Sequence, residues 1–252
     1  MASKFRRPAY INHDARAWRL ATAKNDSKTG SGSYEFHKTF FPNYSPTPLV
    51  ALSGKLADEV GIKAVYVKFE GQRLDLPSFK ILGASWAVFK TLVSRANLSA
   101  DQCNTIAALK EALASKFANA LPDATDNSVS GPNNPVSSLP TLFAATDGNH
   151  GRAVARMGAL LGLPVHIFVP EAITGHDAVV HSIRGEGAVV TSLALSYDET
   201  VISAFEAAEK LEPAGSGILV QDTSFPGYDD EVPSVSNTVS HLDFRLCHRL
   251  RC

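Results

Sequence analysis

The chain has 252 residues, of which 44% are hydrophobic and 19% charged, and its formal net charge is −1. This is the composition of an ordinary globular protein, and the near-neutral charge argues against nucleic acid or a membrane surface as the main partner. No apolar run approaches the length of a membrane span. The chain has three cysteines, an odd number and too few for a disulfide framework, so we expect a reducing, cytoplasmic compartment.

The first 20 residues contain no apolar signal-peptide core. They do carry four arginines and a single acidic residue, Asp14. A mitochondrial presequence is therefore an alternative to a plain solvated terminus. The following residues 24–33 (KNDSKTGSGS) predict a polar loop.

Residues 63–70 (KAVYVKFE) alternate and are β-branched, which predicts a strand. Beyond Pro77, residues 78–96 predict a helix, because their apolar side chains mostly follow helical spacing. Residues 122–140 are rich in Pro, Gly, Ser and Asn and predict a long polar loop.

From residue 142 onward, strands and helices alternate with short connections. The predicted strands are 142–146, 164–170, 188–193 and 217–222, and the predicted helices are 148–162, 171–184 and 196–211. Ser196 and Glu199 have the spacing of a capping box for the last helix. The alternation predicts a parallel, doubly wound α/β sheet. Ligands of such sheets bind beyond the carboxyl ends of strands, which directs attention to residues 146–151 and 222–228.

The first candidate site residue is Lys80, in Ser78-Phe79-Lys80 at the start of a predicted helix. The helix N-terminus, partial burial and a second positive group would favour the neutral amine that a Schiff-base lysine requires. The alternative is a solvated helix lysine, which is the usual environment of this residue.

The second candidate is the segment 146–151 (TDGNHG), between a strand and a helix. Gly148 and Gly151 allow close backbone approach, and free N–H groups at the helix start can bind an anion. Asp147 is a candidate general base, or alternatively only the cap of the helix.

A third candidate, Asp222, ends a predicted strand and is either an acid/base residue or an ordinary turn aspartate. Dinucleotide, P-loop, H-E-x-x-H and G-x-S-x-G motifs are absent from the sequence. The C-terminal Cys247, His248 and Cys252 match no zinc-binding pattern, so no metal is expected.

Four segments together resemble the diaminopropionate ammonia-lyases, a family of fold-type-II pyridoxal phosphate (PLP) enzymes of the tryptophan-synthase-β type. They are YSPTPLVAL (44–52), SFKILGASWA (78–87), ATDGNHGRAVA (145–155) and QDTSFPGY (221–228). The resemblance implies α,β-elimination on 2,3-diaminopropionate, giving pyruvate and ammonia. Two alternatives stay open: a serine or threonine dehydratase-like lyase, and a non-catalytic fragment.

The resemblance also implies the roles of single residues. Lys80 would hold PLP covalently, and Phe79 would pack on its ring. The segment 148–151 would contribute to cofactor and substrate binding, with Asn149 bonded to the phenolic oxygen and His150 beside it. Asp147 and Asp222 would be the acid/base pair, one for each face of the substrate α-carbon. The implied partner is a small amino acid, and a homodimer is the candidate assembly.

The sequence departs from the family at Phe69, at Pro77 and above all after residue 233. The family's glycine-rich phosphate loop is expected further along than this chain reaches, since the chain has no Gly-Gly pair. We therefore expect a C-terminally truncated large domain formed by residues 1–85 and 218–252, with a divergent tail from about residue 234. A small α/β domain would span 86–217. Exposed apolar surface is expected in residues 1–75.

Overall fold

The computed structural model describes residues 31–118, 139–213 and 215–223. The N-terminal segment with the arginines, most of the predicted loop 122–140, and the residues from 224 to the C-terminus lie outside the described residues. Predictions on those segments therefore stay predictions. Within the described part, no helix is long and apolar enough to cross a membrane.

A four-stranded parallel sheet forms the centre of the structure. Its strands are β3 (Thr141–Ala145), β4 (Val165–Pro170), β5 (Val189–Leu193) and β6 (Gly217–Leu219). Their spatial order is β5-β4-β3-β6, and all three pairings are parallel. The chain steps from β3 outward to β5 and then returns to the other side of β3, so the carboxyl end of β3 lies at a topological switch point.

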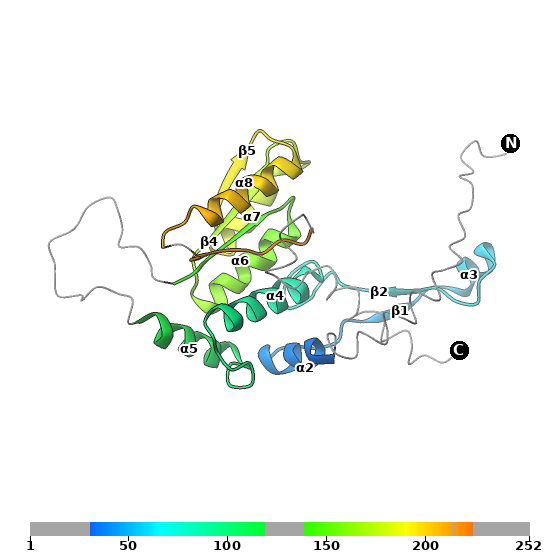
Figure 1. Ribbon diagram of the computed structural model, residues 1–252. Coiled ribbons are helices and arrows are strands. Elements are labelled where there is room, and N and C mark those ends of the chain that lie inside the picture. Colours follow the sequence, from blue (N-terminus) through cyan, green and yellow to red (C-terminus); the bar gives the residue numbers. More distant parts are fainter. Residues whose placement is uncertain (1–30, 119–138, 214, 224–252) are drawn as a thin grey trace, which may run out of the picture.

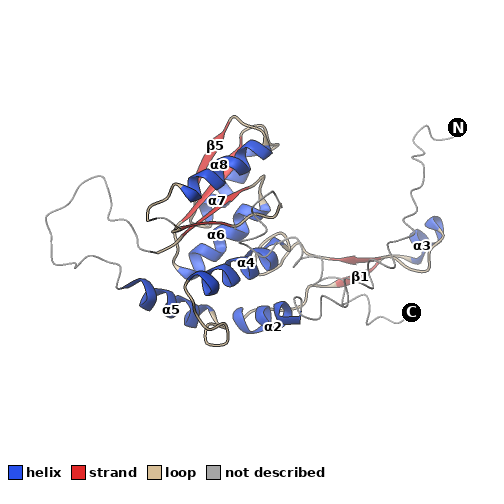
Figure 2. Cartoon of the chain, viewed as in Figure 1, coloured by secondary structure: helices blue, strands red, loops and turns tan. Residues whose placement is uncertain are grey.

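Helices cover both faces of this sheet, as Figures 1 and 2 show. The helix α8 (Tyr197–Glu209) packs against β3, β4 and β6. On the other face, α6 (Asn149–Leu161) packs against β3 and β4, and α7 (His176–Gly185) packs against β4 and β5. A further helix, α4 (Lys80–Arg95), packs on α6. The predicted doubly wound α/β architecture is confirmed in this part of the chain.

Apolar periodicity explains why these elements form where they do. Residues Val154, Met157 and Leu161 of α6 are all buried, at the helical spacing that the sequence shows. The β3 strand is buried along almost its whole length, as expected for a strand covered on both faces. The capping box of α8 is also present, since Ser196 and Glu199 each accept a hydrogen bond from the other's backbone N–H.

Two predicted boundaries differ from the structure. Residues 171–175 form a turn, and α7 begins only at His176, preceded by Gly175 in a left-handed conformation. The β6 strand ends at Leu219 although a strand was predicted through residue 222. Beyond β6, the backbone N–H of Val220 still donates to Phe143 O of β3. The partner strand β3 itself ends two residues after Phe143.

The N-terminal part contains α2 (Ser31–Phe40), β1 (Leu49–Ala51), α3 (Gly54–Val60) and β2 (Tyr66–Lys68). The prediction of a loop through residue 33 was wrong for its last three residues. The helix α2 begins at Ser31 and carries Phe36, whose ring lies 4.6 Å from that of Phe89 in α4. This tertiary contact outweighs the local preference of Gly and Ser for loops.

The antiparallel pair β1–β2 and the helix α3 between them form an extended arm, residues 49–68, which points away from the sheet (Figure 1). Its large apolar side chains are exposed, among them Val50, Leu56, Tyr66 and Val67. The expected exposure of apolar surface in residues 1–75 is thereby confirmed for the arm, whereas Phe36, Phe40 and Phe41 of the same part are buried.

The remaining helix, α5 (Ile106–Ala118), packs against α6. The predicted domain boundaries after residues 85 and 217 fall inside α4 and β6 respectively. Because β6 pairs with β3, residues 217–219 belong to the central sheet. The division of the whole chain into two domains stays a prediction.

Candidate active site

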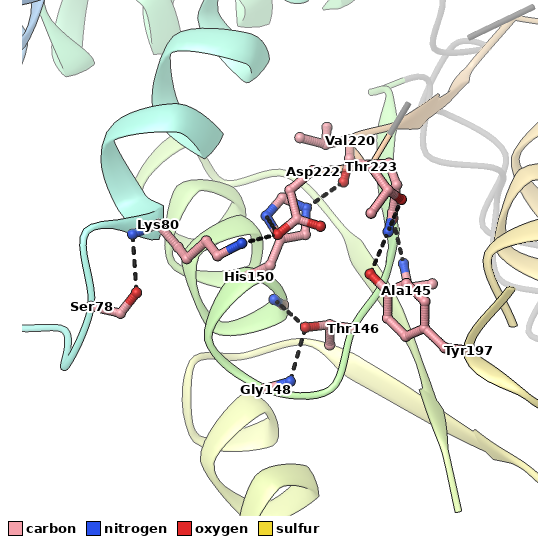
Figure 3. Close-up of polar contacts among 12 residues, drawn as sticks. Ser78, Lys80, Ala145, Thr146, Gly148, His150, Tyr197, Val220, Asp222 and Thr223 are labelled. Atoms are coloured by element: carbon pink, nitrogen blue, oxygen red, sulfur yellow. Dashed lines mark hydrogen bonds and ion pairs between the residues drawn. The ribbon is translucent and has the colours of Figure 1, made fainter. Parts of the chain in front are cut away.

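Three chain segments meet at the carboxyl edge of the sheet, beside the switch point (Figure 3). They are the start of α4, the turn 146–151 that follows β3, and residues 220–223 that follow β6. These segments contain all the residues that the sequence analysis predicted for the site. Parallel pairing of β3 with β6 places the two post-strand segments side by side.

Lys80 is the first residue of α4, and its backbone N–H donates to Ser78 Oγ at 3.1 Å. This bond satisfies one of the amides that a helix start leaves free. The Lys80 side chain is 34% exposed, and its Nζ is in direct contact with Asp222 Oδ2. The expected second positive group beside Lys80 is thus replaced by a carboxylate. Phe79, half-buried, is the N-cap residue.

A tight turn precedes this lysine. Arg73 and Leu76 exchange two backbone hydrogen bonds, while Leu74 and Asp75 between them both have positive φ. Two central residues with positive φ are typical of a type I′ turn, where Asn and Gly are preferred. The strain in Leu74 and Asp75 is held in place by Arg73, which is buried and ion-paired with Glu70.

Thr146 organises the turn after β3. Its side chain is buried, and its Oγ1 accepts hydrogen bonds from the amides of Gly148 and Gly151, both at 3.0 Å. These two N–H groups are therefore engaged within the turn, contrary to the expectation that they are free for an anion. A Cβ at Gly151 would collide with Thr146 Cγ2 and lie 3.0 Å from Ile167 Cγ2, so close packing requires the glycine.

Asp147 and Asn149 are both exposed at the rim of the site. The alternative reading of Asp147 as the cap of α6 is wrong, since the N-cap residue is Gly148 and the first-turn amide of Gly151 donates to Thr146 Oγ1. Gly148 has a φ of 154°, which a residue with a Cβ rarely adopts. The glycine thereby lets the chain turn into α6 with Asp147 facing outward.

His150 is buried below this rim, with only 3% of its side chain exposed. Its Nε2 lies 2.7 Å from the carbonyl oxygen of Val220, which ties α6 to the chain beyond β6. Its Nδ1 is buried and has no hydrogen-bond partner among the described residues. Burial lowers the pKa of His150, and the Asp222 carboxylate nearby offsets only part of this effect.

Asp222 is largely buried and contacts Lys80. Burial by itself would raise the pKa of its carboxyl group, but the neighbouring His150 and the Lys80 amine lower it overall. Because burial holds His150 in its neutral form, we attribute the lowered pKa of Asp222 mainly to Lys80. Asp222 is therefore not the solvated turn aspartate that was the alternative reading.

A buried amide holds the two post-strand segments together. Gln221 is 1% exposed; its Oε1 accepts from Ala145 N at 3.1 Å, and its Nε2 donates to the Tyr197 hydroxyl at 3.0 Å. The Gln221 side chain thereby extends the β3–β6 pairing beyond the end of β6. Burial, followed by the charges of Asp222 and Asp147, raises the pKa of Tyr197 to about 12. Both carboxylates thus act on one phenol.

Four further residues shape the site although the sequence did not predict a role for them: Ser78, Thr146, Tyr197 and Gln221. Two of them had a local signal, because a hydroxyl residue just before a helix or a glycine-rich turn commonly accepts backbone N–H bonds. Gln221 and Tyr197 gave no such signal. Their contact joins residues 24 positions apart in the sequence, and only the folded sheet brings them together.

A family model for pyridoxal-phosphate-dependent enzymes matches residues 40–228. The chain therefore belongs to this family, whose cofactor is PLP, and its parallel sheet is that of the fold-type-II members. The residues at the sheet edge fit such a cofactor, because an accessible primary amine is the group that the PLP aldehyde requires.

Within the family, the similarity is to diaminopropionate ammonia-lyases. The enzyme of Salmonella typhimurium is 30% identical over 199 residues, which are 79% of this chain and 42% of the relative. The crystal structure of the apo Escherichia coli enzyme has a TM-score of 0.63 and 25% identity, covering 88% of this chain and 54% of that one. The Escherichia coli complex with D-serine has a TM-score of 0.63, 26% identity and coverage of 88% and 50%. The resemblance seen in the motifs is confirmed, and the chain spans less than half the length of the curated relative.

Proposed function

We propose that this chain carries the lysine-bearing part of a PLP-dependent ammonia-lyase that eliminates ammonia from 2,3-diaminopropionate, giving pyruvate. The contact between the Lys80 amine and the Asp222 carboxylate carries this proposal, because it places a reactive amine beside a proton acceptor at the sheet's switch point. The similarity to diaminopropionate ammonia-lyases supports the choice of substrate.

When bound, PLP supplies an electron sink that stabilises negative charge at the α-carbon of an amino acid. Lys80 is the residue of this chain that would bind the cofactor covalently, and Ser78 fixes the helix start that presents it. Phe79, as N-cap residue, would pack on the cofactor ring. Asn149, at the exposed rim, would donate a hydrogen bond to the cofactor.

The two carboxylates divide the proton transfers. Asp222 lies beside Lys80 and can take up a proton near the amine. Asp147 stands exposed at the rim of the turn, where it can serve a substrate that presents its α-proton from the other side. Burial and the charges of both carboxylates raise the pKa of the Tyr197 phenol, so both carboxylates lie within electrostatic range of it.

Cofactor binding tests this proposal without depending on turnover. The purified chain incubated with PLP and reduced with borohydride should carry the cofactor on the peptide that contains Lys80, as peptide mass mapping would show. Lys80→Ala should lose both the label and the absorbance band of bound cofactor, while Lys90→Ala, at an exposed position of the same helix, should keep both. Label on other lysines, with none on Lys80, would refute the proposed role of this residue.

Substrate identity is tested by product formation. We expect pyruvate from 2,3-diaminopropionate to exceed pyruvate from serine and 2-oxobutanoate from threonine. A preference for serine or threonine would favour the dehydratase alternative. Label on Lys80 with no product from any of the three would favour the non-catalytic alternative. Light scattering on the same preparation would test the homodimer that the resemblance implies.

A further inference from the structure

We infer that His150 Nδ1 accepts a hydrogen bond from Asp222 when Asp222 gains a proton, so that the two side chains form one proton-storing pair whose state depends on Lys80. This inference rests on the proposed function, in which Asp222 takes up and releases protons. The proposed function leaves one observation unexplained: the buried Nδ1 of His150 faces the site and has no hydrogen-bond partner in the part of the chain that the structure describes.

The position of the proton on His150 follows from its contacts. A carbonyl oxygen can only accept a hydrogen bond, so the 2.7 Å contact with Val220 O requires a proton on Nε2. A neutral imidazole carries one such proton, and burial favours the neutral form. Nδ1 is therefore an unprotonated acceptor, held in the interior by α6.

This acceptor faces another acceptor. His150 Nδ1 lies 3.9 Å from Asp222 Oδ2, which is too far for a hydrogen bond and close enough to become one after a small side-chain movement. While Asp222 is ionised, no proton lies between the two atoms, and Lys80 Nζ is the partner of the carboxylate. One added proton on Asp222 would turn the facing acceptors into an O–H···N hydrogen bond. The pair can therefore bind one proton between Asp222 Oδ2 and His150 Nδ1, and this proton is absent while Asp222 is ionised.

Lys80 decides between the two states. As an ammonium ion in contact with Oδ2, Lys80 favours the ionised carboxylate. Once the lysine nitrogen is engaged elsewhere, this preference for the ionised carboxylate is lost, and a proton on Asp222 can form a hydrogen bond to His150 Nδ1. The other titratable groups that act on this pair are Asp147 from the turn after β3 and, from α8, Tyr197, whose phenol stays neutral.

A titration of Asp222 in the cofactor-free chain tests the inference. The carboxyl carbon signal of Asp222, assigned with Asp222→Asn in an aspartate-labelled chain, reports its pKa by NMR. In Lys80→Met, the loss of the ammonium should raise this pKa by about one unit or more. In the double variant Lys80→Met/His150→Phe, which lacks the acceptor, the pKa should be about one unit lower than in Lys80→Met alone.

His150→Gln in the Lys80→Met background is the matched control. Its amide can donate to Val220 O and accept from Asp222, so it should retain most of the raised pKa. A purely structural role of His150 would not separate Phe from Gln in this way. Equal Asp222 pKa values in the His150→Phe and His150→Gln double variants would overturn the inference.

The imidazole itself gives a second readout that needs no change at position 150. The nitrogen-15 signals of His150 in the unsubstituted chain should show a protonated Nε2 and a bare Nδ1, and in Lys80→Met the Nδ1 signal should shift as Asp222 takes up its proton. A proton on Nδ1, or no response, would sink the inference. Because these measurements contain neither cofactor nor substrate, absent lyase activity would count against the proposed function alone.

Discussion

The central sheet and the arm formed by residues 49–68 use the same kinds of side chain, yet they bury them very differently. In β4, Ile167 and Val169 are fully buried, whereas Val50 and Val67 of the β1–β2 pair are 46% and 43% exposed. The sheet is covered by helices on both faces, while the arm has only one short helix between its strands. Apolar, β-branched sequence therefore makes a strand possible, but burial depends on whether another element packs on it.

The two regions are also held by different forces. The sheet is stabilised by apolar contacts of α6 and α8. The base of the arm is held by charge: Arg73 donates to Glu70 Oε2 at 2.7 Å, to Thr47 Oγ1 at 2.9 Å and to Ser45 O at 3.1 Å. If this contrast holds, changes in the sheet and at the base of the arm should affect stability differently.

Truncation of a buried sheet residue should separate the two regions most clearly. Ile167→Ala should lower the free energy of unfolding by about 4 kcal/mol, since it removes a fully buried side chain from a packed interior. Val67→Ala, in the exposed strand of the arm, should change it by less than about 0.5 kcal/mol. Urea unfolding followed by circular dichroism measures both, and similar losses for the two variants would contradict the contrast.

Acid should act on the contact between α2 and α4 before it acts on the base of the arm. His37 is fully buried, its Nε2 lies 2.9 Å from Leu82 O, and burial lowers its pKa from 6.5 to about 4. The unfolded chain takes up the proton first, so the stability from neutral His37 is complete above pH 6.5 and declines as the pH falls toward 4. The full loss is about 3 kcal/mol.

The contribution of Glu70 to stability changes with pH in the same direction as that of His37, but in a lower pH window. Burial would raise the pKa of its carboxyl group, but hydrogen bonds from Arg73 and Thr47 and the charge of Arg73 lower it overall. Its contribution is present above the usual glutamate range and is lost only below it. His37→Gln should therefore reduce the loss of unfolding free energy between pH 7 and pH 5. Part of this loss should remain in the variant, because burial also lowers the pKa values of His150 and His166. An unchanged pH dependence in His37→Gln would show that this contact is not the acid-sensitive one.

The smallest expected effect concerns the ionic base of the arm. Arg73→Gln leaves the Glu70 carboxylate partly buried without its ion pair, whose side chains are 3% and 12% exposed. We expect a loss of about 2 kcal/mol, since the hydrogen bonds of Arg73 to the carboxylate are lost while Thr47 still donates to Glu70. The loss should appear as faster proteolysis and hydrogen exchange in residues 49–68. Lys210→Gln, which breaks an exposed pair with Glu206, is the control and should have almost no effect. Equal protection of the arm in both variants would argue that apolar contacts hold it after all.

Much of the architecture was predictable because it depends on local patterns. The strand–helix alternation, the buried stripe of α6 and the capping box of α8 each lie within a short stretch of sequence. The loop prediction failed at residues 31–33 because the helix that they begin is held against α4 by Phe36, whose ring contacts aromatic side chains about 50 residues away. The candidate site residues were also found by motif, but their contacts with one another were not.

The sequence by itself determined that a parallel α/β sheet forms after residue 140, and it pointed to Lys80, the turn 146–151 and Asp222 as the candidate site. Only the tertiary structure decided that Asp222 is the partner of Lys80, that Thr146 occupies two of the turn's amides, and that His150 faces Asp222 with an unprotonated nitrogen. The physical reason is range. Periodicity and capping act within a few residues, whereas the pairing of β3 with β6 closes a loop of more than 70 residues before these side chains can meet.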